Sequence, residues 1–436
     1  MIEPRTLSGF MELLPEDQIV FNNIKDIIKK NYEKYGFLPL DTPVLESANV
    51  LLAKAGGETE KQIYRFVKGE SDYCMRFDLT VPLAKYVAKN YNELNFPFAR
   101  YQIGKVYRGE RPQKGRFREF YQCDIDVIGK NELSLSYDAL VPSVIYSIFR
   151  ELNFGKFTIY VSNRKILRGF LASLELLDQS EDILRLIDKV DKIGKENFTL
   201  ALKEDYKVQV DKVEKIVDFI SISGSVDEQL QKLKQLGVEN EDFVSGVTEL
   251  ETVTSLMKEF GIEENYFAIN LAIARGLDYY TGTVYETFLD EHRNIGSVSS
   301  GGRYENLAGF YTKEKLPGVG MSIGLTRLFD QLKTNNLLKS STSALSKVVI
   351  LPMGDTVNDC IKISNELRKN DINNVLYLQD GKFKNKLSFA TRSGAKYVII
   401  VGEDEVNSQK FTLKNLDEFK QEQLSLQEIV EILKNN

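Results

Sequence analysis

Residues 107–126 read YRGERPQKGRFREFYQCDID, and this stretch is the strongest guide to the fold. Between about residues 96 and 128, two strand-like runs are joined by a charged loop that contains glycine, a pattern typical of neighbouring strands in one sheet. Alternate residues of the second run share one face. This face carries Phe120, Gln122, Asp124 and Asp126, so an aromatic ring, an amide and carboxylates lie in one row. Such a row can stack a base and hold a small zwitterion.

The loop between these runs is rich in arginine and lysine. Arginine binds phosphate through two parallel hydrogen bonds, so the loop is a candidate contact for a nucleotide or a nucleic acid. The alternative is a solvated hairpin with surface salt bridges, which is how runs of charge commonly occur. Taken alone, the stretch leaves both interpretations open.

A second segment, residues 275–286, reads RGLDYYTGTVYE. Alternation of Val284 and Phe288 with polar residues predicts a half-buried strand after the glycine. A cation, a carboxylate and three tyrosines on one short segment can hold a phosphate and surround a small polar substrate. The alternative is an ordinary amphipathic strand, because tyrosine is common in strands.

A third segment, residues 318–328, reads GVGMSIGLTRL and predicts a glycine-spaced strand that turns into a helix. Glycine permits close approach of another backbone, and helix N-termini and arginine both attract phosphate. Arg327 lies in the first turn of the predicted helix. Strand-to-helix turns of this kind are common, so the segment indicates a phosphate site only in combination with the others.

The composition describes a globular protein of two or three domains, with 436 residues, 42% hydrophobic and 28% charged. A net charge of −6 argues against bulk non-specific binding of nucleic acid but leaves local basic patches open. The one histidine, His292, lies in a polar turn where we expect it to be solvated. Any acid–base chemistry would therefore fall to carboxylates, or the reaction must need no side-chain base.

The cysteines and the apolar runs argue against several classes of protein and of binding site. Cys74, Cys123 and Cys360 are far apart and odd in number, so neither a disulfide framework nor a zinc site is indicated. No apolar run approaches membrane-spanning length, and residues 1–15 lack the apolar stretch of a signal peptide. We expect a cytoplasmic protein without a membrane partner.

The first part of the chain mixes helices and strands. Apolar residues recur at helical spacing from Val20 to Tyr35, and Gly36 is a stop signal for that helix. The chain then runs extended to Pro43. Residues at about 170–260 are rich in lysine and glutamate with few glycines or prolines, which predicts a helical insertion into a sheet domain over residues 1–332.

The last part of the chain predicts a separate domain. Residues 333–346 include a serine-rich stretch and read as a linker. In residues 347–436, apolar strands at 348–351, 375–378 and 397–401 alternate with helical segments. This alternation predicts a compact α/β domain with parallel strand pairing.

Taken in order, these segments resemble the three signature motifs of class II aminoacyl-tRNA synthetases. The helix that precedes Pro43 is similar to the first, dimer-forming motif, Arg108-Gly109-Glu110 to the second, and Gly324-Leu325-Thr326-Arg327 to the third. Residues 275–286, with Ser300-Gly301-Gly302-Arg303-Tyr304, resemble the two motifs specific to histidyl-tRNA synthetases. The resemblance spans nearly the whole chain.

This resemblance implies a mixed α/β (α+β) fold, with a catalytic domain on an antiparallel sheet, a helical insertion and a C-terminal α/β anticodon-binding domain. It implies a histidine–tRNA ligase, which activates L-histidine with ATP to histidyl-adenylate and pyrophosphate and then transfers histidine to the 3′ end of its tRNA. ATP would be a substrate with Mg²⁺, and no prosthetic group or protein-bound metal is expected. The implied assembly is a homodimer.

The resemblance also assigns the ATP site. Arg108 and Arg327 match the arginines that hold the α- and γ-phosphates, and Arg275 matches an arginine beside the α-phosphate. Glu110 matches the contact to the adenine amino group, and Phe120 the ring that stacks on the base. Adenylation needs no protein nucleophile, so positioning and charge stabilisation are the expected tasks.

The same resemblance also implies which residues contact histidine and which contact the tRNA. The residues matching the histidine site are Asp78 and Thr80, helped by Gln122, for the ammonium, and Asp126, Tyr279 and Tyr280 for the imidazole, with Tyr304 nearby. Leu79, between Asp78 and Thr80, is counted with the same site. The loop residues matching the contact to the tRNA acceptor end are Arg111, Gln113, Lys114 and Arg116. The basic residues on the expected anticodon surface are Lys382, Lys384, Lys386, Arg392 and Lys396, for which a solvated lysine-rich helix is the alternative.

Two other functions fit part of the pattern. A catalytically inactive paralogue that senses histidine, like the regulatory subunit of ATP phosphoribosyltransferase, typically lacks the arginine of position 275 and the C-terminal domain, and both are present here. Synthetases for glycine, proline or threonine share the C-terminal domain type. Tyr279-Tyr280 and Gly301-Gly302-Arg303-Tyr304 argue against them. The loop at residues 111–116 resembles the bacterial form of the family, whereas residues 77–82 and 122–126 resemble the eukaryotic and archaeal forms, so the taxonomic branch stays open.

Overall fold

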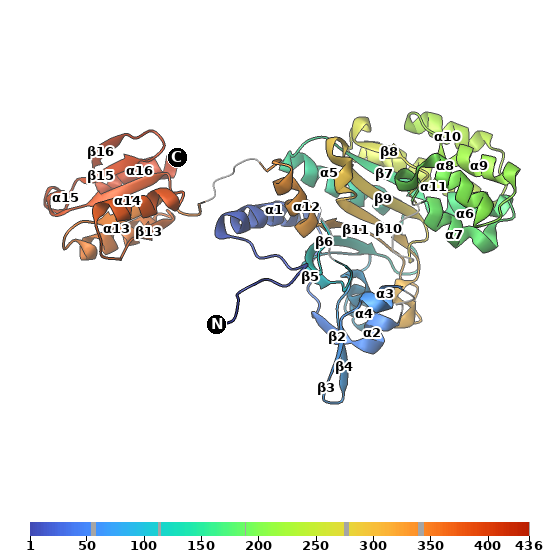
Figure 1. The fold of residues 1–436 in the computed structure, drawn as a ribbon, viewed down its shortest axis with the longest axis horizontal. Coiled ribbons are helices and arrows are strands. Elements are labelled where there is room, and N and C mark those ends of the chain that lie inside the picture. Colours follow the sequence, from blue (N-terminus) through green and yellow to red (C-terminus); the bar gives the residue numbers. More distant parts are fainter. Residues whose placement is uncertain (54–57, 112–114, 188, 274–278, 339–343, 436) are drawn as a thin grey trace. The chain divides into compact units, whose positions relative to one another are not determined.

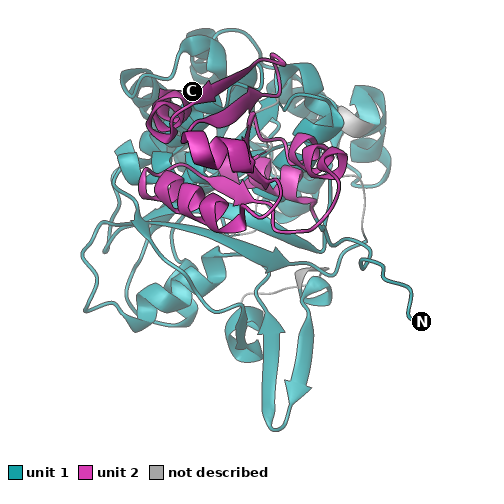
Figure 2. Ribbon diagram, turned by 90° about the vertical axis from the view of Figure 1, so that its left-hand side faces the viewer, with its two compact units in different colours: residues 1–12, 24–338 teal, residues 13–23, 339–436 magenta. Residues whose placement is uncertain are grey.

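The computed structural model describes residues 1–53, 58–111, 115–187, 189–273, 279–338 and 344–435. The chain divides into two compact units, one formed by residues 1–12 and 24–338 and the other by residues 13–23 and 339–436 (Figure 2). The larger unit contains an eight-stranded sheet, a three-stranded sheet and a group of helices at one end of the larger sheet (Figure 1). The smaller unit contains a five-stranded sheet.

The eight-stranded sheet is almost wholly antiparallel. Only its two outer pairs, β1 with β5 and β7 with β8, are parallel. The strands in spatial order are β1 (Leu38–Pro39), β5 (Phe98–Tyr107), β6 (Glu119–Ile128), β11 (Gly318–Gly324), β10 (Ser299–Tyr304), β9 (Thr283–Leu289), β7 (Phe157–Asn163) and β8 (Phe267–Ile269). The predicted antiparallel catalytic sheet is confirmed.

One face of this sheet is apolar and is covered by two helices, α1 (Pro15–Lys34) and α5 (Ser136–Leu152). Tyr32 of α1 donates a hydrogen bond to the carbonyl of Cys123 at 2.8 Å, and its ring lies 5.7 Å from that of Tyr101. Gly36, with φ of +78°, follows α1 at the predicted helix stop. The helix therefore ends where the chain must turn into β1.

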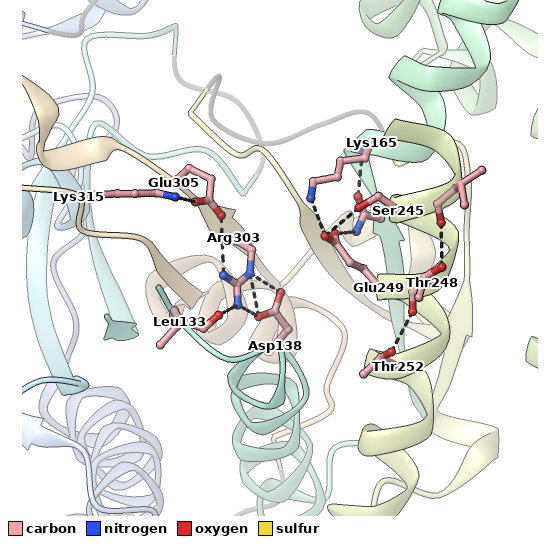
Figure 3. Close-up of polar contacts among 12 residues, drawn as sticks. Leu133, Asp138, Lys165, Ser245, Thr248, Glu249, Thr252, Arg303, Glu305 and Lys315 are labelled. Atoms are coloured by element: carbon pink, nitrogen blue, oxygen red, sulfur yellow. Dashed lines mark hydrogen bonds and ion pairs between the residues drawn. The ribbon is translucent and has the colours of Figure 1, made fainter. Parts of the chain in front are cut away.

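A buried ion pair fastens α5 to the same face (Figure 3). Arg303 of β10 donates from Nε and Nη2 to the carboxylate of Asp138, with Nη2 to Oδ2 at 2.6 Å, and Nη2 also reaches the carbonyls of Leu133 and Ser134. Burial raises the pKa of Asp138, and the hydrogen bonds from Arg303 oppose that rise. This pair is saturated with partners, as a structural ion pair should be.

The opposite face of the large sheet carries α4 (Thr80–Lys89), whose Leu83, Ala84 and Val87 are buried against the sheet and the neighbouring tyrosines. Beside α4 lies a three-stranded antiparallel sheet in the order β2, β4, β3. The elements of this part are β2 (Leu45–Ser47), α2 (Ala48–Leu52), α3 (Glu58–Gln62), β3 (Arg65–Lys68) and β4 (Ser71–Met75).

Among the described residues, six α-helices separate β7 from β8 in the sequence, and they occupy residues 164–259, against an expectation of about 170–260. They are α6 (Arg164–Ser173), α7 (Ser180–Ile187), α8 (Val190–Glu204), α9 (Val210–Ile220), α10 (Val226–Gln235) and α11 (Glu241–Glu259). Stacked rings of Phe170 and Phe219, 4.2 Å apart, lie in their core. Lys165 pairs with Glu249 at 2.5 Å and joins α6 to α11 (Figure 3).

The smaller unit is an α/β domain with sheet order β13-β12-β14-β15-β16. Its elements are β12 (Val348–Pro352), α13 (Val357–Lys369), β13 (Asn374–Leu376), α14 (Phe383–Arg392), β14 (Tyr397–Val401), α15 (Glu403–Ser408), β15 (Phe411–Asn415), β16 (Gln421–Leu424) and α16 (Leu426–Asn435). The predicted parallel pairing of β12 with β13 and β14 is confirmed. Strands β15 and β16 then add antiparallel, which the sequence did not predict.

Two local expectations differ from the structure. The strand expected after Gly276 begins at Thr283, and it is buried along most of its length rather than half-buried, because it is an inner strand of the sheet.

Among the described residues, no helix is long and apolar enough to cross a membrane.

Candidate functional site

Polar residues gather on the face of the large sheet that α4 partly covers. Residues paired across neighbouring strands point to the same side of a sheet. Asp126 of β6 pairs with Arg100 of β5 and with Gly320 of β11, which in turn pairs with Gly302 of β10. The sheet register therefore places a carboxylate beside an arginine on one side and beside two glycines on the other.

Asp126 is the centre of this face. Its Oδ2 lies 2.5 Å from Nη2 of Arg100, and its Oδ1 accepts a hydrogen bond from the Tyr304 hydroxyl at 3.0 Å. Burial raises the pKa of Asp126 to about 6, although the charge of Arg100 and the Tyr304 hydrogen bond both lower it. Near neutral pH the side chain is thus mainly an ionised acceptor. Such a carboxylate can bind the N–H group of a small polar ligand.

The two glycines are required by close contacts. A Cβ atom on Gly320 would lie 2.2 Å from Oδ1 of Asp126 and 2.5 Å from the carbonyl oxygen of Ile125. A Cβ atom on Gly302 would lie 2.9 Å from the ring of Tyr280. Any side chain at either position would therefore displace a residue of the site.

Three tyrosines border the carboxylate. The rings of Tyr279 and Tyr280 lie 4.9 Å apart, and those of Tyr279 and Tyr304 lie 6.0 Å apart. Burial raises the pKa of all three phenols, which therefore stay neutral. Nη1 of Arg164, the first residue of α6, donates to the carbonyl of Tyr280 at 2.9 Å and so holds this segment against the helical insertion.

The start of α4 brings another carboxylate to the same region. Asp78 is buried and accepts a hydrogen bond from the backbone N–H of Val81 at 2.9 Å. Burial raises its pKa, whereas that hydrogen bond and the charge of Arg108 lower it. Thr80, the first residue of the helix, lies within hydrogen-bonding reach of Tyr279, and Leu79 is fully buried. On β6, the Gln122 side chain donates to Ser322 Oγ at 3.0 Å.

Arg108 lies between two aromatic rings at the end of β5. Its guanidinium carbon is 4.4 Å from the centre of the Phe77 ring and 5.0 Å from that of Phe120, and its Nε donates to the Phe77 carbonyl at 3.3 Å. Burial lowers its pKa, which still leaves the group charged. The structure therefore brings Phe120 and Arg108 together beside Asp78.

The loop between β5 and β6 carries paired charges. Glu110 and Arg116 form an ion pair at 3.3 Å, so a predicted adenine contact and a predicted tRNA contact lie against each other. Arg111 and Arg116 are exposed. Gln113 and Lys114 lie outside the described residues.

Of the three arginines expected at the phosphates, the structure describes Arg108 and Arg327. Arg327, in the first turn of α12 (Leu325–Thr334), donates from Nη2 to the carbonyl of Ile295 at 2.5 Å. Next to it, the Thr326 hydroxyl accepts a hydrogen bond from the backbone N–H of Tyr121 at 2.8 Å, which ties the helix to β6. Arg275 lies outside the described residues.

Comparison with known proteins gives the family. A model of the histidyl-tRNA synthetase family matches residues 9–328, and a model of the anticodon binding domain matches residues 347–436. The chain belongs to the histidyl-tRNA synthetase family.

Whole-chain relatives agree with this result. The histidine–tRNA ligase of Clostridium tetani is 53% identical over 436 residues, covering 100% of this chain and 99% of its own. That of Finegoldia magna is 48% identical over 434 residues, with both chains covered completely. The crystal structure of the histidyl-tRNA synthetase from Nostoc has a TM-score of 0.91 at 41% identity, with full coverage of both chains. The chain is thus an aminoacyl-tRNA synthetase that attaches histidine to its tRNA.

The anticodon-binding domain of the synthetase places its basic residues unequally. Lys382, Lys384, Arg392 and Lys396 are exposed around α14. Lys386 is only 8% exposed, and its Nζ donates to the carbonyl of Pro352 at 2.7 Å. Lys386 follows the exposed Asn385 in α14, and its side chain is directed towards the sheet. It is therefore a structural residue rather than a surface cation.

Two buried polar residues of the synthetase site had no role assigned from the sequence. Arg100 is fully buried on β5, and Asp124 is buried on β6, opposite Gln102 and Ser322. Burial raises the pKa of Asp124 to about 7. The alternation of Arg100 and Gln102 with Tyr101 and Ile103 along β5 is the signal in the sequence, because it repeats the polar period of β6.

Proposed function

We propose that the polar face of β6, with the start of α4 and the three tyrosines, binds L-histidine for adenylation. The observation that carries this proposal is Asp126, a buried carboxylate held by Arg100 and Tyr304, for which Gly320 of β11 leaves room because it has no side chain. A neutral imidazole has one donor and one acceptor nitrogen, so an ionised carboxylate at this position selects the donor. Amino acids lacking that N–H would leave a buried charge without a partner.

The substrate's ammonium group would bind at the other end of the row. Asp78, Thr80 and Gln122 supply a carboxylate, a hydroxyl and an amide within one region, and three donors of an ammonium group match these acceptors. Tyr280 and Tyr304 would flank the ring, and Leu79 would pack beneath the site. This arrangement leaves the substrate carboxylate directed to the end of β5, where Arg108 lies.

ATP would then bind at the end of β5 and the start of α12. The guanidinium of Arg108 would pair with the α-phosphate and that of Arg327 with the γ-phosphate. Arg275 would be a third cation at the reacting phosphate. Phe120 offers a ring for the adenine, and Glu110 an acceptor for its amino group. For this to happen, Glu110 must exchange Arg116 for the adenine amino group, and Arg327 must leave the Ile295 carbonyl.

The chemistry needs positioned charge rather than a nucleophile from the protein. The histidine carboxylate attacks the α-phosphorus and pyrophosphate leaves, while cations stabilise the charge that develops on the phosphate oxygens. Mg²⁺ would enter with ATP, since it is commonly held by substrate phosphates with one or two carboxylates. The terminal ribose hydroxyl of the tRNA then attacks the adenylate carbonyl, and the released phosphate can accept the proton.

Transfer RNA would contact both units of the chain. We assign the acceptor end to Arg111, Gln113, Lys114 and Arg116, and the anticodon to Lys384 and its exposed basic neighbours. The proposed division is a catalytic domain at residues 1–332 with its helical insertion, a linker at 333–346 and an anticodon-binding domain at 347–436. A homodimer formed through the first motif completes the proposal.

The test is ATP–pyrophosphate exchange with each of the twenty amino acids, using wild type and Asp126→Asn. Exchange should depend on histidine, and the variant should lose roughly 2–4 kcal/mol in kcat/KM for histidine because an amide leaves the imidazole mispaired. Asp138→Asn, which changes a buried carboxylate on the other face of the sheet, is the control. Unchanged histidine-dependent exchange in Asp126→Asn would show that this carboxylate does not recognise the imidazole.

A further inference from the structure

Two buried arginine–aspartate pairs lie on opposite faces of the same sheet and differ in their hydrogen bonding. On the face covered by α5, Arg303 makes hydrogen bonds to both oxygens of Asp138 and to two carbonyls. On the site face, Arg100 is 0% exposed and approaches Asp126 to 2.5 Å. Within the part of the chain that the structure describes, no nitrogen of the Arg100 guanidinium makes a hydrogen bond of good geometry. The Arg100 pair is therefore not a closed structural ion pair.

Acceptor atoms further along the same face of β6 are also unsatisfied. Oδ1 of Asp124 and Oε1 of Gln122 are buried and have no hydrogen-bond partner among the described residues. Asp124 and Asp126 lie on the same face of β6. A buried polar atom without a partner costs roughly 1–3 kcal/mol, so folded proteins rarely leave several together unless a ligand uses them.

The charges of this cluster depend on Arg100. Burial is the main cause that raises the pKa of Asp124 to about 7 and that of Asp126 to about 6, and the positive charge of Arg100 is the main opposing cause for both. If Arg100 were neutral, both carboxyl groups would bind protons more readily. A protonated Asp126 would present a donor to the imidazole N–H in place of an acceptor.

We propose that Arg100 is a positioning residue for histidine recognition, which holds Asp126 ionised and oriented through Oδ2 so that the carboxylate can accept a hydrogen bond from the imidazole. Asp124 is the second carboxylate of this cluster and offsets the charge of Arg100. The inference rests on the proposed histidine site. Arg100 touches neither ATP nor the reacting atoms in this scheme, so its effect must pass through Asp126.

A double-mutant cycle in pyrophosphate exchange separates this role from a general contribution to stability. Arg100→Met should raise the KM for histidine roughly 10–100-fold, because it leaves a buried carboxylate without its counter-ion, while the KM for ATP stays unchanged. Arg100→Lys should recover part of the loss, since a point charge keeps the ionisation but not the planar geometry. In the Asp126→Asn background, Arg100→Met should change the KM for histidine by less than about threefold, because interacting residues are not additive.

Asp138→Asn is the matched control for loss of a buried charge pair, and it should lower the melting temperature without changing the KM for histidine. Where Arg100→Met does not fold, Arg100→Lys carries the test with an expected rise in KM of roughly 3–10-fold. An equal rise in the KM for ATP, a full effect of Arg100→Met in the Asp126→Asn background, or a wild-type KM for histidine in Arg100→Lys would each overturn the inference. If Asp126→Asn alone leaves histidine recognition intact, the histidine site itself is misassigned.

Discussion

Replacement of Gly320 by alanine adds one methyl group where the structure leaves no space for it. The new Cβ would lie 2.2 Å from Oδ1 of Asp126 and 2.5 Å from the carbonyl oxygen of Ile125. Contacts between carbon and oxygen are normally about 3.3 Å or longer, so one of these groups must move by roughly 1 Å. The Ile125 carbonyl belongs to the backbone of an inner strand, and the Asp126 side chain is the easier group to displace.

Overpacking of this size costs roughly 1–3 kcal/mol of stability, and a displacement of about 1 Å at a reacting site can cost roughly 100-fold in rate. We therefore expect Gly320→Ala to fold with a lower melting temperature and to lose about 100-fold in kcat/KM for histidine, with a smaller change in the KM for ATP. Pyrophosphate exchange at varied histidine concentration gives the kinetic values, and thermal unfolding gives the stability.

Gly246→Ala is the matched control, because its Cβ would lie 2.8 Å from the backbone nitrogen and the Cγ1 atom of Ile166, between α11 and α6. It adds a comparable steric conflict within the helical insertion, so it should lower stability without a specific effect on histidine. A wild-type KM for histidine in folded Gly320→Ala would refute the placement of Asp126 in the substrate site. Equal kinetic losses in both variants would point to a general loss of folding instead.

Four further substitutions test other parts of the chain. The pKa of Asp124 is raised to about 7 in the folded state, so the fold loses stability as pH rises from about 4 to 7, by at most roughly 4 kcal/mol. The Asp124→Asn variant should therefore have a higher melting temperature than wild type at pH 8 and the same melting temperature near pH 4. If its melting temperature depends on pH as that of wild type does, this prediction is wrong. Lys384→Glu should weaken tRNA binding and reduce the slope of log affinity against log salt by roughly 1, without changing exchange in the absence of tRNA, whereas Lys386→Glu should unfold the anticodon-binding domain. Arg275→Ala should lower the adenylation rate roughly 10²–10³-fold while calorimetric histidine binding survives; a normal rate would remove this arginine from the mechanism.

The sequence alone determined those parts of the protein that depend on local pattern. The helix that ends at Gly36, the paired strands around residues 98–128 and the parallel strands of the last domain all follow from spacing, because strand and helix periods are properties of neighbouring residues. The family followed from motifs of the same local kind. Asp126 could be nominated as a site residue because alternate positions of a strand share a face.

Tertiary structure decided the features that depend on which strands become neighbours. Arg100 lies 26 positions before Asp126 in the sequence (126 − 100), and only the register of β5 on β6 places the two side by side. Gly320 came into contact with Asp126 by the pairing of β11 with β6, and Tyr304 by a further strand. The burial of Lys386 likewise depends on how α14 packs on β12. Burial, ionisation and steric fit are set by contacts between segments distant in the sequence, and no local pattern encodes them.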